Sequence, residues 1–169
     1  MRKVLVPVDG SRNSLHAVRH VVNAFMQNTA MEVHLLNVQS PLSRHAARFL
    51  SRRNREQYHR DRGTAALAGA RRQLDKFGVP YTVTIEIGDR AEIIAREARR
   101  LHCDEIVMAT ARKNSFTRML EDSTTNRVLE LTHVPVEVIA GDAVSNVERW
   151  GLPAALAAML AALFMIAAD

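Results

Sequence analysis

The stretch KVLVPVDGS, residues 3–11, decides the fold. Its first six residues form a short run rich in β-branched side chains without polar alternation, which is typical of a strand buried on both faces. Asp9, Gly10 and Ser11 then supply the residue types of a tight turn that leads into a helix. A buried strand that passes directly into a helix indicates an α/β domain with a parallel sheet.

The same alternation of strand and helix patterns continues along the chain. Four more strands are predicted at residues 31–38, 81–87, 105–109 and 136–139. Helices are predicted between them, the first ending near residue 28 and the others spanning residues 65–77, 90–101 and 123–131. We therefore expect an α/β fold with an open five-stranded parallel sheet and helices on both faces. Ligands bind such sheets at the carboxyl ends of the strands, which points to the turns that begin at Asp9 and Thr110.

Length and composition favour one globular domain in the cytoplasm. The chain has 169 residues, 47% of them hydrophobic, which suits a single full-sized domain and argues against wholesale disorder. Its one cysteine, Cys103, cannot form an internal disulfide, as suits a reducing compartment. The N-terminus contains neither a signal-peptide core nor a small-residue cleavage site.

The positive charge is concentrated in one segment. Between residues 44 and 62, seven arginines stand against two acids, so this segment carries the whole net charge of +5. From Pro41 onward, apolar residues recur at helical spacing and arginines occupy the other faces, which predicts a basic amphipathic helix over residues 41–62. We expect residues 44–62 to bind anionic lipid or an acidic surface, with a solvated helix packed on the domain as the alternative. Nucleic acid ranks last, because only Phe49 and Tyr58 are available to stack on bases.

Residues that could support catalysis are sparse. Among the seven histidines, the best metal-ligand spacing is the i, i+4 pair His16 and His20, and no third ligand accompanies it. Cys103 lies where a helix leads into a buried strand, a position typical of a small buried residue. The sequence contains no GxSxG, CxxC or P-loop motif. We therefore expect neither an enzyme nor a metal site.

Several motifs, taken in order, resemble the universal stress protein family over residues 1–140. They are KVLVPVDGS (residues 3–11), IGDRAEIIAREAR (87–99), DEIVMAT (104–110) and SFTRMLEDSTTNRVLELTHVPVEVI (115–139). The resemblance implies the sheet order 3-2-1-4-5 of adenine-nucleotide alpha-hydrolase-like folds. It also implies a homodimer that pairs through the last strand, at Val136, Glu137, Val138 and Ile139.

The resemblance also implies a nucleotide cleft. Its candidate positions here are Pro7, Val8, Asp9, Val38, Met108, Ala109, Arg112 and Ser123. Many family members hold ATP phosphates with a loop of spacing Gly, two residues, Gly, nine residues, Gly and Ser or Thr. This chain has Ala109, Arg112 and Asp122 in place of the glycines and keeps only the hydroxyl of Ser123. The Asp122 carboxylate would repel a triphosphate and suits a helix N-cap. We expect no cofactor, with ATP or AMP held by Arg112 as the alternative.

The C-terminus carries a long uncharged stretch. GLPAALAAMLAALFMIAA, residues 151–168, contains no charge over eighteen residues. A helix of that length spans about 27 Å, close to the roughly 30 Å hydrocarbon core of a bilayer. We expect a domain over residues 1–142, a linker over 143–150 and a hydrophobic helix over 151–168. The residues expected to contact a membrane or partner are Trp150, Leu152, Leu156, Leu160, Leu163 and Phe164.

These patterns favour a non-enzymatic stress-response or regulatory homodimer in the cytoplasm. Its C-terminal helix would tether it to a membrane or a membrane transporter, as a peripheral or tail-anchored protein of the inner membrane. One alternative is a nucleotide-binding sensor with a modified phosphate loop. Another is a soluble homo-oligomer that assembles through its tails.

Overall fold

The computed structural model describes residues 1–43, 45, 48–112 and 124–143. The chain divides into two compact units, Met1–Ala111 with Asp122–Gly141 and Arg112–Glu121 with Asp142–Asp169. The fold described below is that of the first unit. The predicted hydrophobic helix and most of the predicted linker lie outside the described residues.

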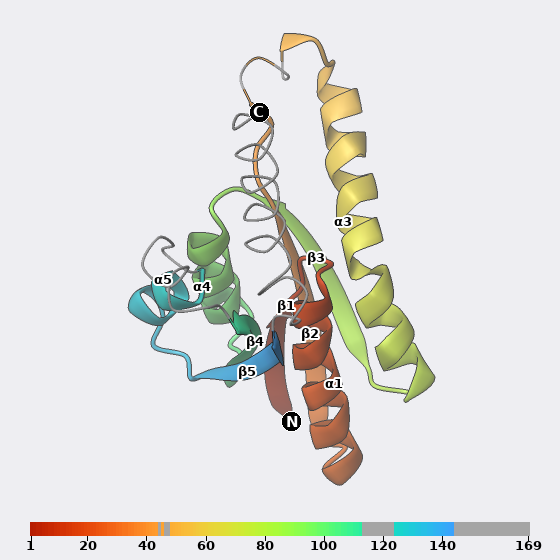
Figure 1. Ribbon diagram of the computed structural model, residues 1–169, viewed down its shortest axis with the longest axis vertical. Coiled ribbons are helices and arrows are strands. Elements are labelled where there is room, and N and C mark those ends of the chain that lie inside the picture. The colour runs from red at the N-terminus through yellow and green to blue at the C-terminus, as the bar shows by residue number, and fades with distance from the viewer. Residues whose placement is uncertain (44, 46–47, 113–123, 144–169) are drawn as a thin grey trace, which may run out of the picture. The chain divides into compact units, whose positions relative to one another are not determined.

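The first unit is built on a five-stranded parallel sheet of order β3-β2-β1-β4-β5 (Figure 1), as predicted. The strands are β1 (Arg2–Pro7), β2 (Met31–Gln39), β3 (Tyr81–Ile87), β4 (Glu105–Arg112) and β5 (Val136–Ala143). The described helices are α1 (Arg12–Gln27), α3 (Arg52–Lys76), α4 (Arg90–Arg100) and α5 (Thr124–Leu131). Helices that connect parallel strands cover both faces of the sheet.

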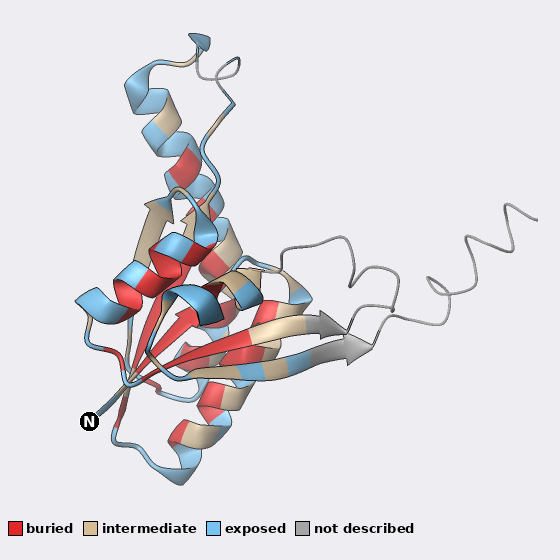
Figure 2. Cartoon of the chain, turned by 90° about the vertical axis from the view of Figure 1, so that its left-hand side faces the viewer, coloured by how far each residue is buried: buried red, intermediate tan, exposed pale blue. Residues whose placement is uncertain are grey.

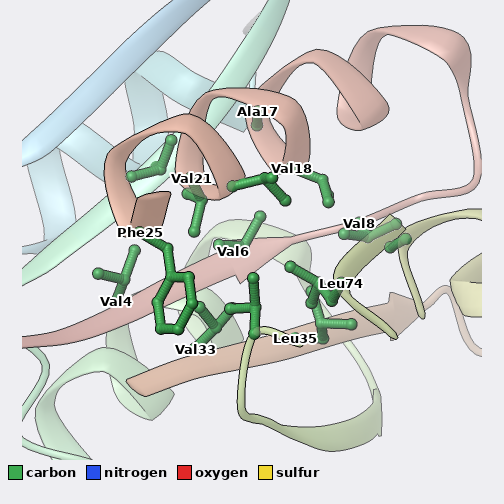
Figure 3. Packing of buried hydrophobic residues seen from close by; sticks show 14 of the residues in the cluster. Val4, Val6, Val8, Ala17, Val18, Val21, Phe25, Val33, Leu35 and Leu74 are labelled. Atoms are coloured by element: carbon green, nitrogen blue, oxygen red, sulfur yellow. The ribbon is translucent and has the colours of Figure 1, made fainter. Parts of the chain in front are cut away.

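One face of the sheet packs against α1 and α3. Val4 and Val6 of β1 point to this side and join Val18 and Val21 of α1 and Leu74 of α3 in one buried cluster (Figure 3). Each of these five side chains is at most 1% exposed. Burying a valine or leucine side chain contributes about 1.5–3 kcal/mol, so this layer accounts for a large share of the stability.

The opposite face packs against α4 and α5. Leu5 of β1 points to this side and contacts a second buried cluster that includes Ile94 of α4, Ile106 of β4 and Val128 of α5. Alternate residues of β1 therefore enter two different cores, and the central strands are buried along most of their length (Figure 2). This is why β1 shows no polar alternation in sequence.

The helices begin at side-chain caps. The Ser11 hydroxyl accepts from the backbone N–H of Ser14 at the start of α1, at 3.2 Å. The Asp89 carboxylate accepts from the backbone N–H of Glu92 at the start of α4, at 3.1 Å, which confirms the predicted cap. Each cap satisfies a donor that has no partner within its helix.

The helix that carries the arginines differs from its prediction. No helix begins at Pro41, because residues 41–43 have no regular structure. Residues 45 and 48 are helical, and α3 begins after its N-cap Ser51. It then continues without a break into the helix predicted at residues 65–77. Gly63 does not interrupt it. A Cβ at this position would lie 2.7 Å from Ile85 Cγ2, so the absence of a side chain lets α3 pack closely on β3. Close packing on the sheet thus offsets the low helix propensity of glycine.

Two strands extend beyond their predicted ends. β4 reaches Arg112 and β5 reaches Ala143, whereas the apolar runs end at 109 and 139. Strand pairing depends on backbone hydrogen bonds, so it can continue after the apolar pattern stops.

Candidate functional site: a cavity beside Asp9

A cavity of about 420 Å³ lies at the carboxyl ends of β1 and β2. Its wall comes from the turn after β1, the end of β2, the segment after β2, the N-terminal half of α3 and the first residue of α4. This is the edge at which parallel sheets bind ligands. The volume falls within the roughly 300–1,000 Å³ typical of small-molecule pockets. We call it the Asp9 cavity.

Asp9 is held in place by its own turn. Its Oδ1 accepts a hydrogen bond from the Ser11 backbone N–H at 2.9 Å. Partial desolvation alone would raise the pKa of the Asp9 carboxyl, but hydrogen bonds from Ser11 and Ser14 outweigh it and lower that pKa. The carboxylate is therefore ionised at neutral pH and offers the cavity an acceptor for hydroxyl or amino groups.

The turn also fits closely against α3. Gly10 has a φ of +84°, and a Cβ on it would lie 3.0 Å from the Cα of Ala66. Only glycine combines this backbone conformation with such a close approach. The contact holds the Asp9 turn against the middle of α3, and the N-terminal half of that helix forms the neighbouring wall of the cavity.

Asn37 links the end of β2 to the end of β1. It is 1% exposed, and its Nδ2 donates to the Val8 carbonyl at 2.6 Å. Its Oδ1 accepts a hydrogen bond from Gln39. The backbone N–H of Val8 donates to the Leu36 carbonyl at 2.8 Å, so both polar groups of Val8 bond to β2. Asn37 was not predicted from the sequence, although an amide within the apolar run LLNV of β2 could have marked it.

The α3 wall carries an aromatic and basic group. Arg62 Nη1 donates to the Tyr58 hydroxyl at 2.7 Å, and the guanidinium lies 5.6 Å from the Tyr58 ring centroid. His59 is 6% exposed, and its ring meets that of Tyr58 edge to face, with 5.4 Å between centroids. These residues were expected to belong to the basic segment 44–62 and not to a cleft. The structure places them in the wall of the Asp9 cavity.

Arg90 lies between this cavity and a second opening of about 470 Å³. In the second opening, Asp89 Oδ2 accepts from Arg127 at 2.7 Å. That hydrogen bond is the main cause that holds the pKa of Asp89 below its usual value. Asp89 is thus occupied as a helix cap and an ion-pair partner.

Among the predicted cleft positions whose side chains the structure describes, Asp9 and Val38 line the Asp9 cavity. Val8 and Met108 are buried in the two hydrophobic clusters, Pro7 is half-buried, and Ala109 packs against the first cluster. The side chain of Arg112 and all of Ser123 lie outside the description, so the altered phosphate loop stays a prediction.

The remaining predicted contact surfaces are placed only in part. β5 is an edge strand in which Val138 is 42% exposed, and Glu137 pairs with His20 at 3.0 Å. Pairing of Val136 and Ile139 with a second copy stays a prediction. Trp150, Leu152, Leu156, Leu160, Leu163 and Phe164 lie outside the described residues.

Among residues 1–43, 45, 48–112 and 124–143, no three histidine, cysteine or acidic side chains are grouped as metal ligands. In that same part of the chain, no helix combines the length and the apolar character that a bilayer crossing requires.

Comparison with known proteins identifies close matches in sequence and fold. Residues 1–140 match the Universal stress protein family. A universal stress protein of Methanocaldococcus jannaschii is 30% identical over 144 residues, covering 82% of this chain and 81% of that protein. The solved structure of hypothetical protein MJ0577 is similar with a TM-score of 0.68 at 25% identity, over 83% of this chain and 96% of that one. An AMP-bound family member from Arabidopsis thaliana has a TM-score of 0.63 at 18% identity, over 85% and 94% of the two chains.

Proposed function

This chain belongs to the universal stress protein family, and from that membership we propose that it is a non-enzymatic regulatory protein that binds an adenine nucleotide in the Asp9 cavity. The observation that carries the proposal is the cavity at the carboxyl ends of β1 and β2, with Asp9 and Val38 in its wall. Both residues are positions that the family resemblance assigned to a nucleotide cleft. A structural neighbour with AMP bound adds support for the ligand class.

The chemistry of the wall suits a nucleoside. The Asp9 carboxylate can accept from ribose hydroxyls or from the exocyclic amino group of adenine. Val38 supplies apolar surface for the base, and the buried Asn37 keeps the end of β2 attached to the turn that carries Asp9. Rigid support of this kind lowers the entropic cost of binding.

The proposal favours a nucleotide with few phosphates. Aspartate at position 122 stands where the phosphate loop of ATP-binding members has glycine, and it would repel a triphosphate. The described residues carry no catalytic constellation around the cavity. We therefore propose that binding changes an interaction of the protein and does not lead to turnover.

Calorimetric titration of the full chain tests this proposal. AMP and adenosine should bind the wild type, and Asp9→Ala should weaken both by about tenfold, the loss expected for one charge-assisted hydrogen bond. Glu130→Gln is the matched control, since Glu130 is an exposed acid of α5 remote from the cavity wall, and it should bind as the wild type does. Absence of heat with both ligands would contradict the proposal, as would an Asp9→Ala variant that binds unchanged.

We also propose that residues 151–168 tether a homodimer to a membrane or membrane transporter. Eighteen uncharged residues in succession favour this, and an edge strand β5 with exposed Val138 suits pairing with a second copy. The exposed arginines of residues 44–62 would then approach anionic lipid or an acidic surface. Flotation with anionic vesicles should carry the full chain upward but not a chain truncated after Asp142. If the full chain stays at the bottom, the tether is wrong, and a large assembly lost on truncation would instead favour self-association of the tails.

A further inference from the structure

We infer that the ligand of the Asp9 cavity carries a phosphate monoester, and that Arg62 of α3 and Arg90 of α4 bind it. This inference rests on the proposed function, because it concerns the same cavity. It assigns to two helix arginines the part that a glycine-bearing loop after the fourth strand plays in ATP-binding relatives. One of the two phosphate partners, Arg62, thus belongs to the basic segment 44–62 that was expected to bind an anionic surface.

Both arginines are free to take an anion. Among the described residues, Arg62 hydrogen-bonds only to the neutral Tyr58 hydroxyl, and Arg90 has no hydrogen-bond or ion-pair partner. Some other arginines of the fold already pair with acids, as Arg52 does with Glu56 and Arg127 with Asp89. The wall of the cavity therefore contains two positively charged arginines and one carboxylate, that of Asp9, so positive charge is in excess. An incoming dianion would offset this excess.

The contact with Tyr58 pre-positions one of these cations. The hydroxyl accepts from Arg62 at 2.7 Å, and the guanidinium lies within cation–π range of the ring at 5.6 Å. The hydrogen bond engages one Nη of the guanidinium, which has five donor N–H groups. The others remain for the paired contacts that a planar guanidinium makes with phosphate oxygens.

The buried ring of His59 is a second, independent indication of a bound group. His59 lines the cavity and is 6% exposed, yet its Nδ1 has no hydrogen-bond partner among the described residues. An unpartnered buried ring nitrogen costs about 1–3 kcal/mol. Because Nδ1 itself has almost no accessible surface, the ring would have to turn toward the cavity for a ligand to supply the missing partner. The wall thus offers a histidine, two arginines and Ser40 for an anionic polar group, and Val38 with Asp9 for a nucleoside.

Charge is what separates a phosphate monoester from other ligands of this size. A nucleoside alone would leave the excess of positive charge over the Asp9 carboxylate unbalanced in a partly enclosed site. A triphosphate would bring more negative charge than two arginines balance beside the Asp9 carboxylate. A monophosphate, with a charge between about −1.5 and −2 at pH 7, fits the wall best.

The test is a calorimetric series with the full chain, using AMP, adenosine and inorganic phosphate as probes. The wild type should bind AMP at least tenfold more tightly than adenosine, and inorganic phosphate should compete weakly. Arg62→Gln and Arg90→Gln should each weaken AMP about tenfold and leave adenosine within about twofold, since one charged hydrogen bond is lost. Arg60→Gln is the matched control, because Arg60 is an exposed arginine of α3 that does not line the cavity. It should leave AMP binding unchanged.

The outcomes separate this inference from the proposed function. Equal affinity of the wild type for AMP and adenosine overturns the phosphate assignment but leaves nucleoside binding intact. The phosphate assignment is also overturned if Arg62→Gln and Arg90→Gln leave the affinity for AMP unchanged, or if Arg60→Gln weakens AMP binding as much as they do. Binding of neither AMP nor adenosine overturns the proposed function and this inference with it. Retention of adenosine by Arg62→Gln and Arg90→Gln shows that these variants are folded.

Discussion

Replacing Gly10 with alanine tests how closely α3 fits against the Asp9 turn. Gly10 has a φ of +84°, where an L-residue costs about 1–2 kcal/mol. The new Cβ would meet the Ala66 Cα at 3.0 Å, well inside the optimum of about 3.5–4.0 Å for two carbons. Because the obstacle is backbone, α3 must shift, and such overpacking costs about 1–3 kcal/mol. Alanine also restricts the unfolded chain, which returns about 0.4–1 kcal/mol.

The net expectation for Gly10→Ala is a loss of about 2–4 kcal/mol in the free energy of unfolding. Urea denaturation followed by far-ultraviolet circular dichroism measures this, with an unchanged m-value showing that both chains unfold alike. Nucleotide affinity should fall in the same variant, because the turn that carries Asp9 moves with Gly10.

Gly78→Ala is the matched control. Gly78 also has a positive φ, +64°, but a Cβ there would meet nothing within 4 Å. Gly78→Ala therefore pays only for placing an L-residue at positive φ, and we expect it to lower the free energy of unfolding by about 1 kcal/mol. The difference between the two variants isolates the contact with Ala66. If Gly10→Ala costs no more than Gly78→Ala, the close approach of α3 to the Asp9 turn is wrong, and so is the cavity wall derived from it.

Three further predictions concern single buried groups. Asn37→Ala should lower the free energy of unfolding by about 1–3 kcal/mol in urea titrations, because the Val8 carbonyl loses its buried donor; an unchanged midpoint would contradict this. Burial by itself would raise the pKa of the Glu97 carboxyl, but hydrogen bonds, the largest from Arg100, outweigh burial and lower that pKa. The stability that Glu97 contributes is therefore fully present above the ordinary pKa of 4.5 and is lost as the pH falls through the lower pKa of the folded state. The stability gap between the wild type and Glu97→Gln should therefore shrink in acid, and a gap that grows would refute the ion pairing. Burial raises the pKa of Cys103 to about 11, so a disulfide reagent at about pH 8 should label the native thiol far more slowly than the urea-unfolded one.

Most of the fold could be predicted from local patterns. The strand at Tyr81–Ile87 has the predicted bounds, and the predicted cap at Asp89 begins α4. Apolar periodicity and capping chemistry act over a few residues, so a single sequence reveals them. Only the start at Pro41 of the helix predicted over residues 41–62 was wrong, because spacing alone does not show whether a partner surface is present to stabilise each turn.

The candidate site was predicted only in part. Asp9 and Val38 were expected from the family resemblance, and both line the cavity. Tyr58, His59 and Arg62 were interpreted as parts of an exposed basic segment. Their position depends on how α3 is rotated against the sheet, and this rotation is set by contacts such as that of Gly63 with Ile85. No periodicity in the segment itself specifies those contacts.

The sequence by itself determined the alternation of buried strands and capped helices, the turn at Asp9, and the concentration of positive charge between residues 44 and 62. Only the tertiary structure decided that part of this basic segment forms one wall of the cavity with the turn after β1, the end of β2 and the start of α4. The physical reason is the distance along the sequence between the residues that interact. Strand and helix patterns arise from neighbours along the chain, whereas the cavity wall joins residues from Asp9 to Arg90 that only close packing of α3 on the sheet brings together.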